Sequence, residues 1–168
     1  MKYVSLSGVV SKTSDSSIPL GTLRTTSLGG VFMRVRLSTS ESVLPVAGSP
    51  LGFRGTLAAS AYKVTSDISN SGSARLCGVC MTTPTTTLPY MWMLIHGDPY
   101  RIAGVTIKTD TNVANSGKLV WKADKVFGQR TAQSTSLAPL NNIGVAWAAD
   151  SGSQLLVANI NGMGAVTS

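Results

Sequence analysis

The chain has 168 residues, enough for one domain with a sizeable core, and 43% of its residues are hydrophobic. Only 12% are charged, which is about half the ~25% usual in globular domains. Lys and Arg outnumber Asp and Glu by 14 to 7, but no three basic residues are consecutive and no zinc-finger spacing occurs, so the pattern does not favour a nucleic-acid-binding domain. The sequence has neither a signal-peptide pattern after Met1 nor an apolar segment of the ~18 residues that a membrane span needs, so we expect synthesis in a cytoplasm, where thiols stay reduced.

The first predicted element is a strand at 3–10, which is followed by a polar segment without periodicity from Ser11 to Pro19. We therefore expect residues 1–18 to form an N-terminal strand or arm with a linker, and residues 19–168 to form a single β domain. The first strand either pairs with the sheet of a neighbouring subunit by strand addition or forms an edge strand of its own domain.

Residues 31–37 have the two-residue period of a strand with one buried face. Every second residue from Val31 to Leu37 is apolar, and Arg34 and Arg36 fall on the opposite face. Turn residues separate further predicted elements, namely strands at 20–26, 51–57, 61–66, 75–82, 90–96, 101–109, 118–123, 142–148 and 154–160, with one turn of helix at 56–62. So many short strands predict an all-β fold, either a β-barrel or a jelly-roll-like sandwich of short antiparallel strands.

A weak internal repeat indicates that one hairpin occurs twice. Residues 77–81 (CGVCM) resemble residues 143–147 (IGVAW), and each copy continues through a turn region into an apolar strand that ends at glycine. The glycine inside each copy, Gly78 or Gly144, allows a neighbouring backbone to approach closely.

Residues with catalytic or metal-binding chemistry are few. Cys77 and Cys80 form a C-x-x-C motif, but in a strand the side chains at i and i+3 point to opposite faces, and a zinc site needs four ligands. His96 is the single histidine and lies beside Asp98 at a predicted turn, where we expect it to end a strand rather than to join a Ser-His-Asp triad. The carboxylates show no pairing suited to acid–base catalysis. We therefore predict no enzyme activity, no metal, no cofactor, and two cysteines that are small, buried residues.

The larger aromatic residues have two interpretations. Trp92, Trp121 and Trp147, together with Tyr90 and Tyr100, could form a sugar-binding platform, or they could pack in the core. Trp92 and Trp147 lie among apolar neighbours in the two repeat copies, which favours core packing.

Several short motifs follow one another in a fixed order. They are Pro19-Leu20-Gly21-Thr22-Leu23-Arg24, Gly30-Val31-Phe32-Met33-Arg34-Val35, Val64-Thr65-Ser66-Asp67, Gly78-Val79-Cys80-Met81, Tyr90-Met91-Trp92-Met93-Leu94-Ile95-His96-Gly97 and Ile143-Gly144-Val145-Ala146-Trp147-Ala148-Ala149. In this order the chain resembles the capsid decoration (cement) proteins of tailed phages, in which PLG, GVA, YxWVQxxG and IGxAL motifs recur. The resemblance covers residues 19–162. It departs from the family at 93–95, where Met-Leu-Ile replaces the segment with VQ, and residues 1–18 match none of these motifs.

The resemblance implies a β-barrel or jelly roll that assembles as a homotrimer on the outside of a capsid and has no catalytic residues. Its partners would be the major capsid protein and further copies of itself, with neither nucleic acid nor membrane, and its location would be the virion. The net charge of +7 would attract an acidic lattice, and we expect Lys2, Lys12 and Arg24 among the contacts. The alternative is a receptor- or carbohydrate-binding β-domain of a virion fibre, which needs an exposed aromatic platform. A third reading, a nucleic-acid-binding barrel, needs an Arg/Lys stripe over exposed aromatics.

Overall fold

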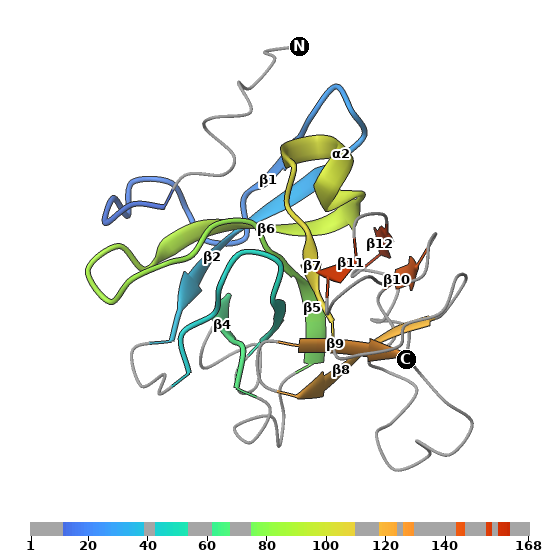
Figure 1. The fold of residues 1–168 in the computed structure, drawn as a ribbon. Helices are drawn as coiled ribbons and strands as arrows, with labels where there is room; N and C mark the ends of the chain where they lie inside the picture. The colour runs from blue at the N-terminus through green and yellow to red at the C-terminus, as the bar shows by residue number, and fades with distance from the viewer. Residues whose placement is uncertain are drawn as a thin grey trace.

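A computed structural model describes the backbone of residues 12–38, 43–53, 62–67 and 75–109, and of five later strands between residues 118 and 161. Side chains are described up to residue 109, except those of residues 75–77. The described part of the chain consists of strands and loops with one short helix, so the predicted all-β class is confirmed (Figure 1). The predicted strand at 3–10 lies outside the described residues, as does the helical turn at 56–62 except for Tyr62.

The strands are short, as the spacing of turn residues predicts. In chain order the elements are β1 (Leu23–Thr25), β2 (Val31–Leu37), β3 (Pro50–Phe53), β4 (Lys63–Thr65), β5 (Arg75–Cys80), β6 (Tyr90–Gly97), the helix α2 (Pro99–Ala103), β7 (Ile107–Lys108), β8 (Lys118–Ala123), β9 (Val126–Gln129), β10 (Gly144–Ala146), β11 (Gln154–Leu155) and β12 (Ala158–Asn161).

The sheet closes into a barrel because β2 and β6 pair directly. Ten strands form one sheet in the order β1-β2-β4-β3-β5-β6-β12-β10-β8-β9, and the additional β2–β6 pairing joins the ring of β2, β4, β3, β5 and β6. All described pairings between strands are antiparallel except that of β2 with β4, which is parallel. The expectation of antiparallel strands is therefore wrong for this one pair, because the long connection between β2 and β4 contains β3 and returns the chain in the same direction.

The interior of the barrel holds the face of β2 that the two-residue period predicts to be apolar. Met33, Val35 and Leu37 from β2 pack with Met91 and Met93 from β6 in one buried cluster. The same cluster contains Leu51, Val64, Cys80 and Ile95 from the other strands of the ring and from β6. Four of the nine buried members contain sulfur, three of them methionines, and flexible Met side chains fill an irregular interior well.

The opposite face of β2 is also buried, which the sequence pattern did not predict. Phe32 is 0% exposed and Arg34 is 1% exposed, although Arg34 was expected on a polar, solvated face. The face is covered because β1 extends the sheet beside β2, while α2 and the segment before β1 lie over it. The barrel wall therefore has a second apolar layer outside it, to which Trp92 and Leu94 of β6 contribute.

The predicted strand at 101–109 is wrong in its first half, where the chain forms α2. Asp98 caps this helix by accepting hydrogen bonds from the amides of Tyr100 (2.9 Å) and Arg101 (3.2 Å), and Pro99 stands at its start. Gly104 ends it in the left-handed conformation, with φ 67°. Asp-Pro was interpreted as a turn, but here it begins a helix, and the strand β7 follows only at 107–108.

The repeated hairpin is confirmed in its pairing. Val79 of β5 lies opposite Leu94 of β6, and Val145 of β10 lies opposite Asn159 of β12. The second strands of the two copies, β6 and β12, also pair with each other. The two hairpins are therefore neighbours in one sheet, in the order β5-β6-β12-β10. Gly78 has no room for a side chain, because a Cβ there would collide with the Leu94 carbonyl oxygen. The glycine in the repeat therefore permits the close approach of β6.

Candidate binding site

A stack of alternating arginine and aromatic side chains lies on the outer face of β1, β2 and β6. The guanidinium carbon of Arg24 is 4.4 Å from the Trp92 ring centroid, and that of Arg34 is 5.6 Å from the same ring. Arg34 and Arg36 each lie 5.5 Å from the Tyr90 ring. The β2–β6 register produces the stack, since it sets Arg34 opposite Trp92 and Arg36 opposite Tyr90. Cation–π contacts of this kind contribute about 0.5–2 kcal/mol each, with the higher values at desolvated sites.

The segment before β1 covers this stack. The backbones of Thr13 and Tyr90 exchange two hydrogen bonds of 3.0 and 3.1 Å. Nη2 of Arg34 donates to the Asp15 carbonyl oxygen at 2.9 Å. The Asp15 carboxylate instead accepts from the amide and hydroxyl of Ser17, both at 2.8 Å, and these bonds lower the pKa of Asp15. Residues 12–17, interpreted as a linker, are therefore attached to the barrel, and the proposed division at residue 18 stays a prediction.

We expect a deletion of residues 1–18 to reduce the free energy of unfolding by about 1–3 kcal/mol, because it leaves the buried Arg34 donor without the Asp15 carbonyl. The domain should remain folded, since its barrel core lies elsewhere. A deletion of residues 1–11 keeps Thr13 and Asp15 and serves as the matched control. Urea denaturation of both truncated chains measures the difference, and equal stability of the two would contradict the role given to residues 12–17.

The three expected contact residues have different surroundings. Lys2 lies outside the described residues. Lys12 is half-buried at the start of the segment that pairs with β6, and Arg24 is half-buried with its guanidinium on Trp92. Arg24 is thus part of the arginine–aromatic stack, whereas Lys12 precedes Thr13, which pairs with Tyr90 of the stack. No described contact joins Lys12 to Arg24.

The residues with possible catalytic chemistry are not brought together. His96 is exposed at the end of β6, while the carboxylate of Asp98 is engaged with the first amides of α2. Among the described side chains, no group of three or more His, Cys, Asp or Glu is arranged to hold a metal ion. Cys80 is a free, buried thiol that donates to the Thr82 carbonyl oxygen at 3.0 Å, and the side chain of Cys77 lies outside the described residues.

Burial raises the pKa of the Cys80 thiol from its ordinary value of 9.0 to about 12. We therefore expect iodoacetamide at pH 8.5 to leave Cys80 unmodified in the folded protein and to alkylate it after unfolding, as read by peptide mass spectrometry. Between pH 9 and 12 the unfolded thiol ionises while the native one keeps its proton, so this group lowers stability as the pH rises. Rapid native alkylation of Cys80 would contradict this.

The aromatic side chains do not form an open platform in the described part of the chain. Trp92 is 2% exposed, in agreement with the predicted core packing, and Tyr90 is half-buried. The side chains of Trp121 and Trp147 lie outside the described residues. A nucleic-acid-binding barrel needs a stripe of arginines over exposed aromatic rings, and the arginines are present here. The aromatic rings, however, are covered by guanidinium groups and by residues 12–17. Nucleic-acid bases therefore have no exposed Trp92 face on which to stack.

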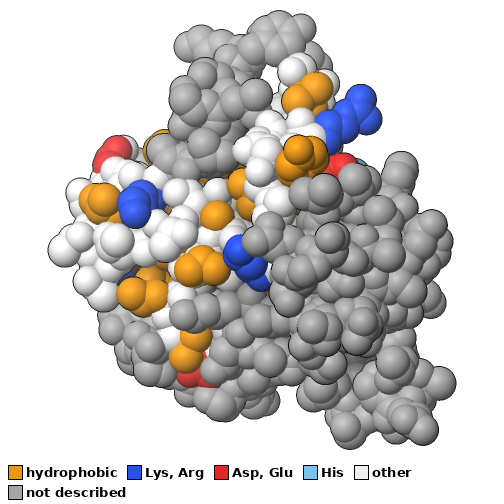
Figure 2. Space-filling view, viewed as in Figure 1, with side chains coloured by type: hydrophobic (Ala, Val, Ile, Leu, Met, Phe, Trp, Pro, Cys, Tyr) orange, Lys and Arg blue, Asp and Glu red, His pale blue; other side chains and the backbone are white. Residues whose placement is uncertain are grey.

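Sequence reasoning missed a second surface, where the β1–β2 hairpin meets α2. We define the hairpin–helix face as the exposed residues at this junction, namely Leu28 of the hairpin with Tyr100 and Arg101 of α2. Leu28 and Tyr100 are each 46% exposed, and Arg101 is exposed as well. Figure 2 shows hydrophobic side chains near a cationic and an acidic one at the upper right of the view. The signal in the sequence was the apolar Leu28 just before the Gly29-Gly30 turn, where a polar residue is usual.

No protein-family model matches the chain, and no curated protein matches it at a significant level. No described helix is long and apolar enough to cross a membrane.

Proposed function

We propose that this protein is a virion structural protein that binds the outer surface of a phage capsid and stabilises the head as a decoration protein. The order of the short motifs from Pro19 to Ala149 supports the proposal, together with the all-β barrel. We propose binding rather than catalysis as its activity.

The observation that carries the proposal is the excess of cationic side chains over carboxylates in the described part of the chain. Asp15 binds Ser17, Asp98 caps α2, and Asp67 is 2% exposed. Of the described cationic side chains, Arg34 is buried, and the others are half-buried or exposed: Lys12, Arg24, Arg36, Lys63, Arg101 and Lys108. A surface with this imbalance favours an acidic partner and accelerates its capture.

The low charge content and the rigid barrel also suit attachment to a large lattice. Hydroxyl-rich loops such as Thr82–Thr87 offer hydrogen bonds without the desolvation cost of charges. We infer a homotrimer, since one trimer would contact several capsid subunits at once, and the linked contacts reinforce one another by effective concentration. Three chains of +7 would then bring a charge of +21 to the capsid surface.

The experiment mixes the purified protein with heads that lack it and measures co-sedimentation, with the oligomeric state determined by sedimentation velocity. We expect a trimer that binds the heads and makes them more resistant to heat or chelator. Higher salt should slow the capture more than it releases bound protein, because the Debye length falls below ~8 Å above physiological salt. A monomer that never co-sediments with heads at low salt would refute the proposal and favour a receptor- or carbohydrate-binding domain.

A further inference from the structure

Arg34 is a buried cation whose hydrogen-bonding capacity is only partly used. Its side chain is 1% exposed, and its guanidinium donates through Nη2 to the Asp15 carbonyl oxygen at 2.9 Å. Nε, the neighbouring donor on the same edge of the guanidinium, is buried and has no hydrogen-bond partner. Because a buried donor without an acceptor is costly, this edge needs an acceptor that the described residues do not supply.

Arg36 has the same deficit on the same face of the sheet. Its Nε is also buried and without a hydrogen-bond partner, while the side chain as a whole is half-buried. Residues two apart in a strand point to the same side, and both guanidinium carbons lie 5.5 Å from the Tyr90 ring. Two unfilled donors on permanently charged groups therefore lie beside one aromatic ring, and the partial exposure of Arg36 puts this end of the stack in contact with solvent.

No carboxylate among the described residues pairs with these arginines. The Asp15 carboxylate accepts from the amide and hydroxyl of Ser17 and not from a guanidinium. Arg24 adds a third cation, and its guanidinium shares the Trp92 ring with that of Arg34. Burial lowers the pKa of Arg34, and the Asp15 charge opposes this effect. The stack thus carries three cations against one carboxylate, and an anion bound there would be stabilised by the difference.

The chemistry of the unfilled donors determines the class of ligand. A guanidinium edge binds the oxygens of an anionic group through charge-assisted hydrogen bonds, and arginine recognises phosphate oxygens particularly well. Two such donors with a surplus of positive charge favour an ion that has several acceptor oxygens and more than one negative charge. Tetrahedral oxyanions such as phosphate and sulfate have both properties.

We propose that the arginine–aromatic stack is a binding site for a doubly charged tetrahedral oxyanion of the phosphate class, held by the Nε donors of Arg34 and Arg36. The ion supplies acceptors that both donors lack and offsets the charge that residues 12–17 cover. Binding therefore stabilises the folded chain. The site acts in the isolated protein, so the inference does not depend on attachment to a capsid.

The test uses the purified full chain with inorganic phosphate and, as a second probe, sulfate. Thermal melting at constant ionic strength compares each oxyanion with sodium chloride, and isothermal titration calorimetry gives the dissociation constant. At an oxyanion concentration about tenfold above that constant, we expect the melting temperature to rise by about 3–6 °C. The Nε–H resonances of Arg34 and Arg36 in proton–nitrogen correlation NMR spectra should shift during the same titration, which locates the ion.

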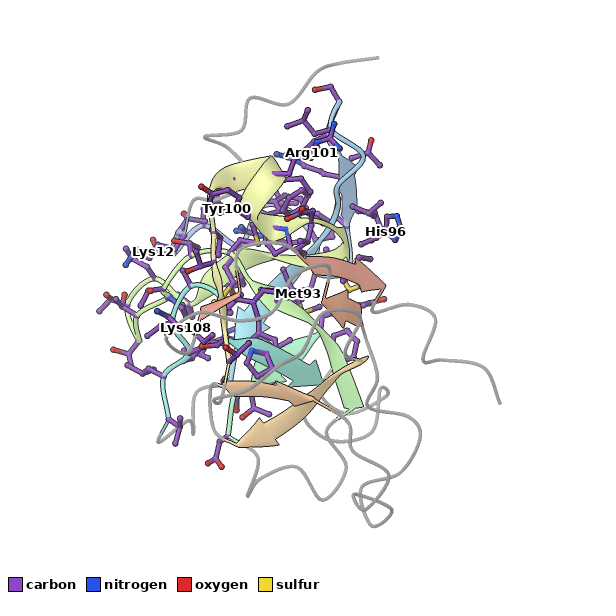
Figure 3. The ribbon with its side chains drawn as sticks, turned by 45° about the vertical axis from the view of Figure 1, so that its right-hand side comes forward. Lys12, Met93, His96, Tyr100, Arg101 and Lys108 are labelled. Carbon is purple, nitrogen blue, oxygen red and sulfur yellow. The ribbon has the colours of Figure 1, made fainter. Side chains whose placement is uncertain are left out.

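Two substitutions remove the proposed donors. Arg34→Lys keeps a positive charge but lacks the Nε donor, and Arg36→Met removes the second donor together with its charge. Each should weaken oxyanion binding at least about tenfold, the loss expected for one charge-assisted hydrogen bond. Arg101→Met is the matched control, because it removes the same charge from an exposed side chain on α2, well away from Lys12 at the start of the covering residues (Figure 3). It should weaken binding less than about twofold, since solvent and salt screen exposed charges.

The proposal is wrong if sodium chloride raises the melting temperature as much as the oxyanions do, because the effect is then only screening of the net charge. It is equally wrong if Arg101→Met weakens binding as much as Arg36→Met, or if neither Nε–H resonance moves at saturating phosphate. If Arg34→Lys does not fold, the half-buried Arg36 still provides the test through its own variant. Loss of binding in Arg36→Met, with binding retained in Arg101→Met, supports the site.

Discussion

Replacing Gly48 with Ala will destabilise the barrel strongly, with a loss of about 2–5 kcal/mol in the free energy of unfolding. Gly48 has φ +88°, and a side chain in the left-handed region costs roughly 1–2 kcal/mol. In addition, a Cβ at Gly48 would collide with the Thr106 carbonyl oxygen, and forced overpacking costs about 1–3 kcal/mol. Neither backbone can withdraw easily, because Gly48 donates to Cys80 at 2.8 Å and accepts from Lys108 at 3.0 Å.

The matched control for this substitution is Gly29→Ala. Gly29 has a similar φ of +80°, but nothing lies within 4 Å of a Cβ added there. Its loss should be about 1–2 kcal/mol, from backbone strain alone. Urea denaturation followed by circular dichroism gives both values, and their difference isolates the collision with the Thr106 carbonyl oxygen just before β7. Equal losses for the two variants would show that the contact between Gly48 and Thr106 carries no constraint.

The sequence predicted the parts of the fold that depend on local periodicity. The alternation from Val31 to Leu37 identified β2 and its inward face, and the two GVx segments identified two paired hairpins. Periodicity cannot show what covers the other face of a strand, so the burial of Arg34 was missed. Periodicity also failed at α2, because Asp98-Pro99 can form a turn or begin a capped helix. Only the residues that follow, up to the C-cap at Gly104, distinguish the two.

The candidate sites depended still more on contacts between distant segments. Arg24, Trp92 and Arg34 come from three strands, and only the β1–β2 and β2–β6 registers place them in one stack. The hairpin–helix face combines residues near 28 and 101, which become neighbours because Gly30 and Gly97 accommodate Ile102. The contact residues predicted from the sequence were chosen for their charge alone, and charge does not show which distant segments become neighbours in the fold.

Trp92→Ala should be the most destabilising of the large-to-small substitutions in this stack, with a loss of about 3–5 kcal/mol. Trp92 is 2% exposed, so truncation leaves a large cavity outside the barrel wall. It also removes the ring between Arg24 and Arg34, and Arg34 is a buried cation whose Nε already has no hydrogen-bond partner. Tyr100→Ala is the control, since an exposed ring should change stability by less than about 0.5 kcal/mol.

A double-variant cycle separates the lost packing from the lost partner of Arg34. Arg34→Met keeps an unbranched side chain of similar length but removes the buried charge, together with its hydrogen bond to the Asp15 carbonyl oxygen. If the ring stabilises the guanidinium, Trp92→Ala will cost less in the Arg34→Met background than in the wild-type protein, with a coupling of about 0.5–2 kcal/mol. Chemical denaturation of the four proteins measures this coupling. Strict additivity would mean that Trp92 acts through its packing alone, and that the 5.6 Å approach of Arg34 to its ring contributes nothing to the stability of the fold.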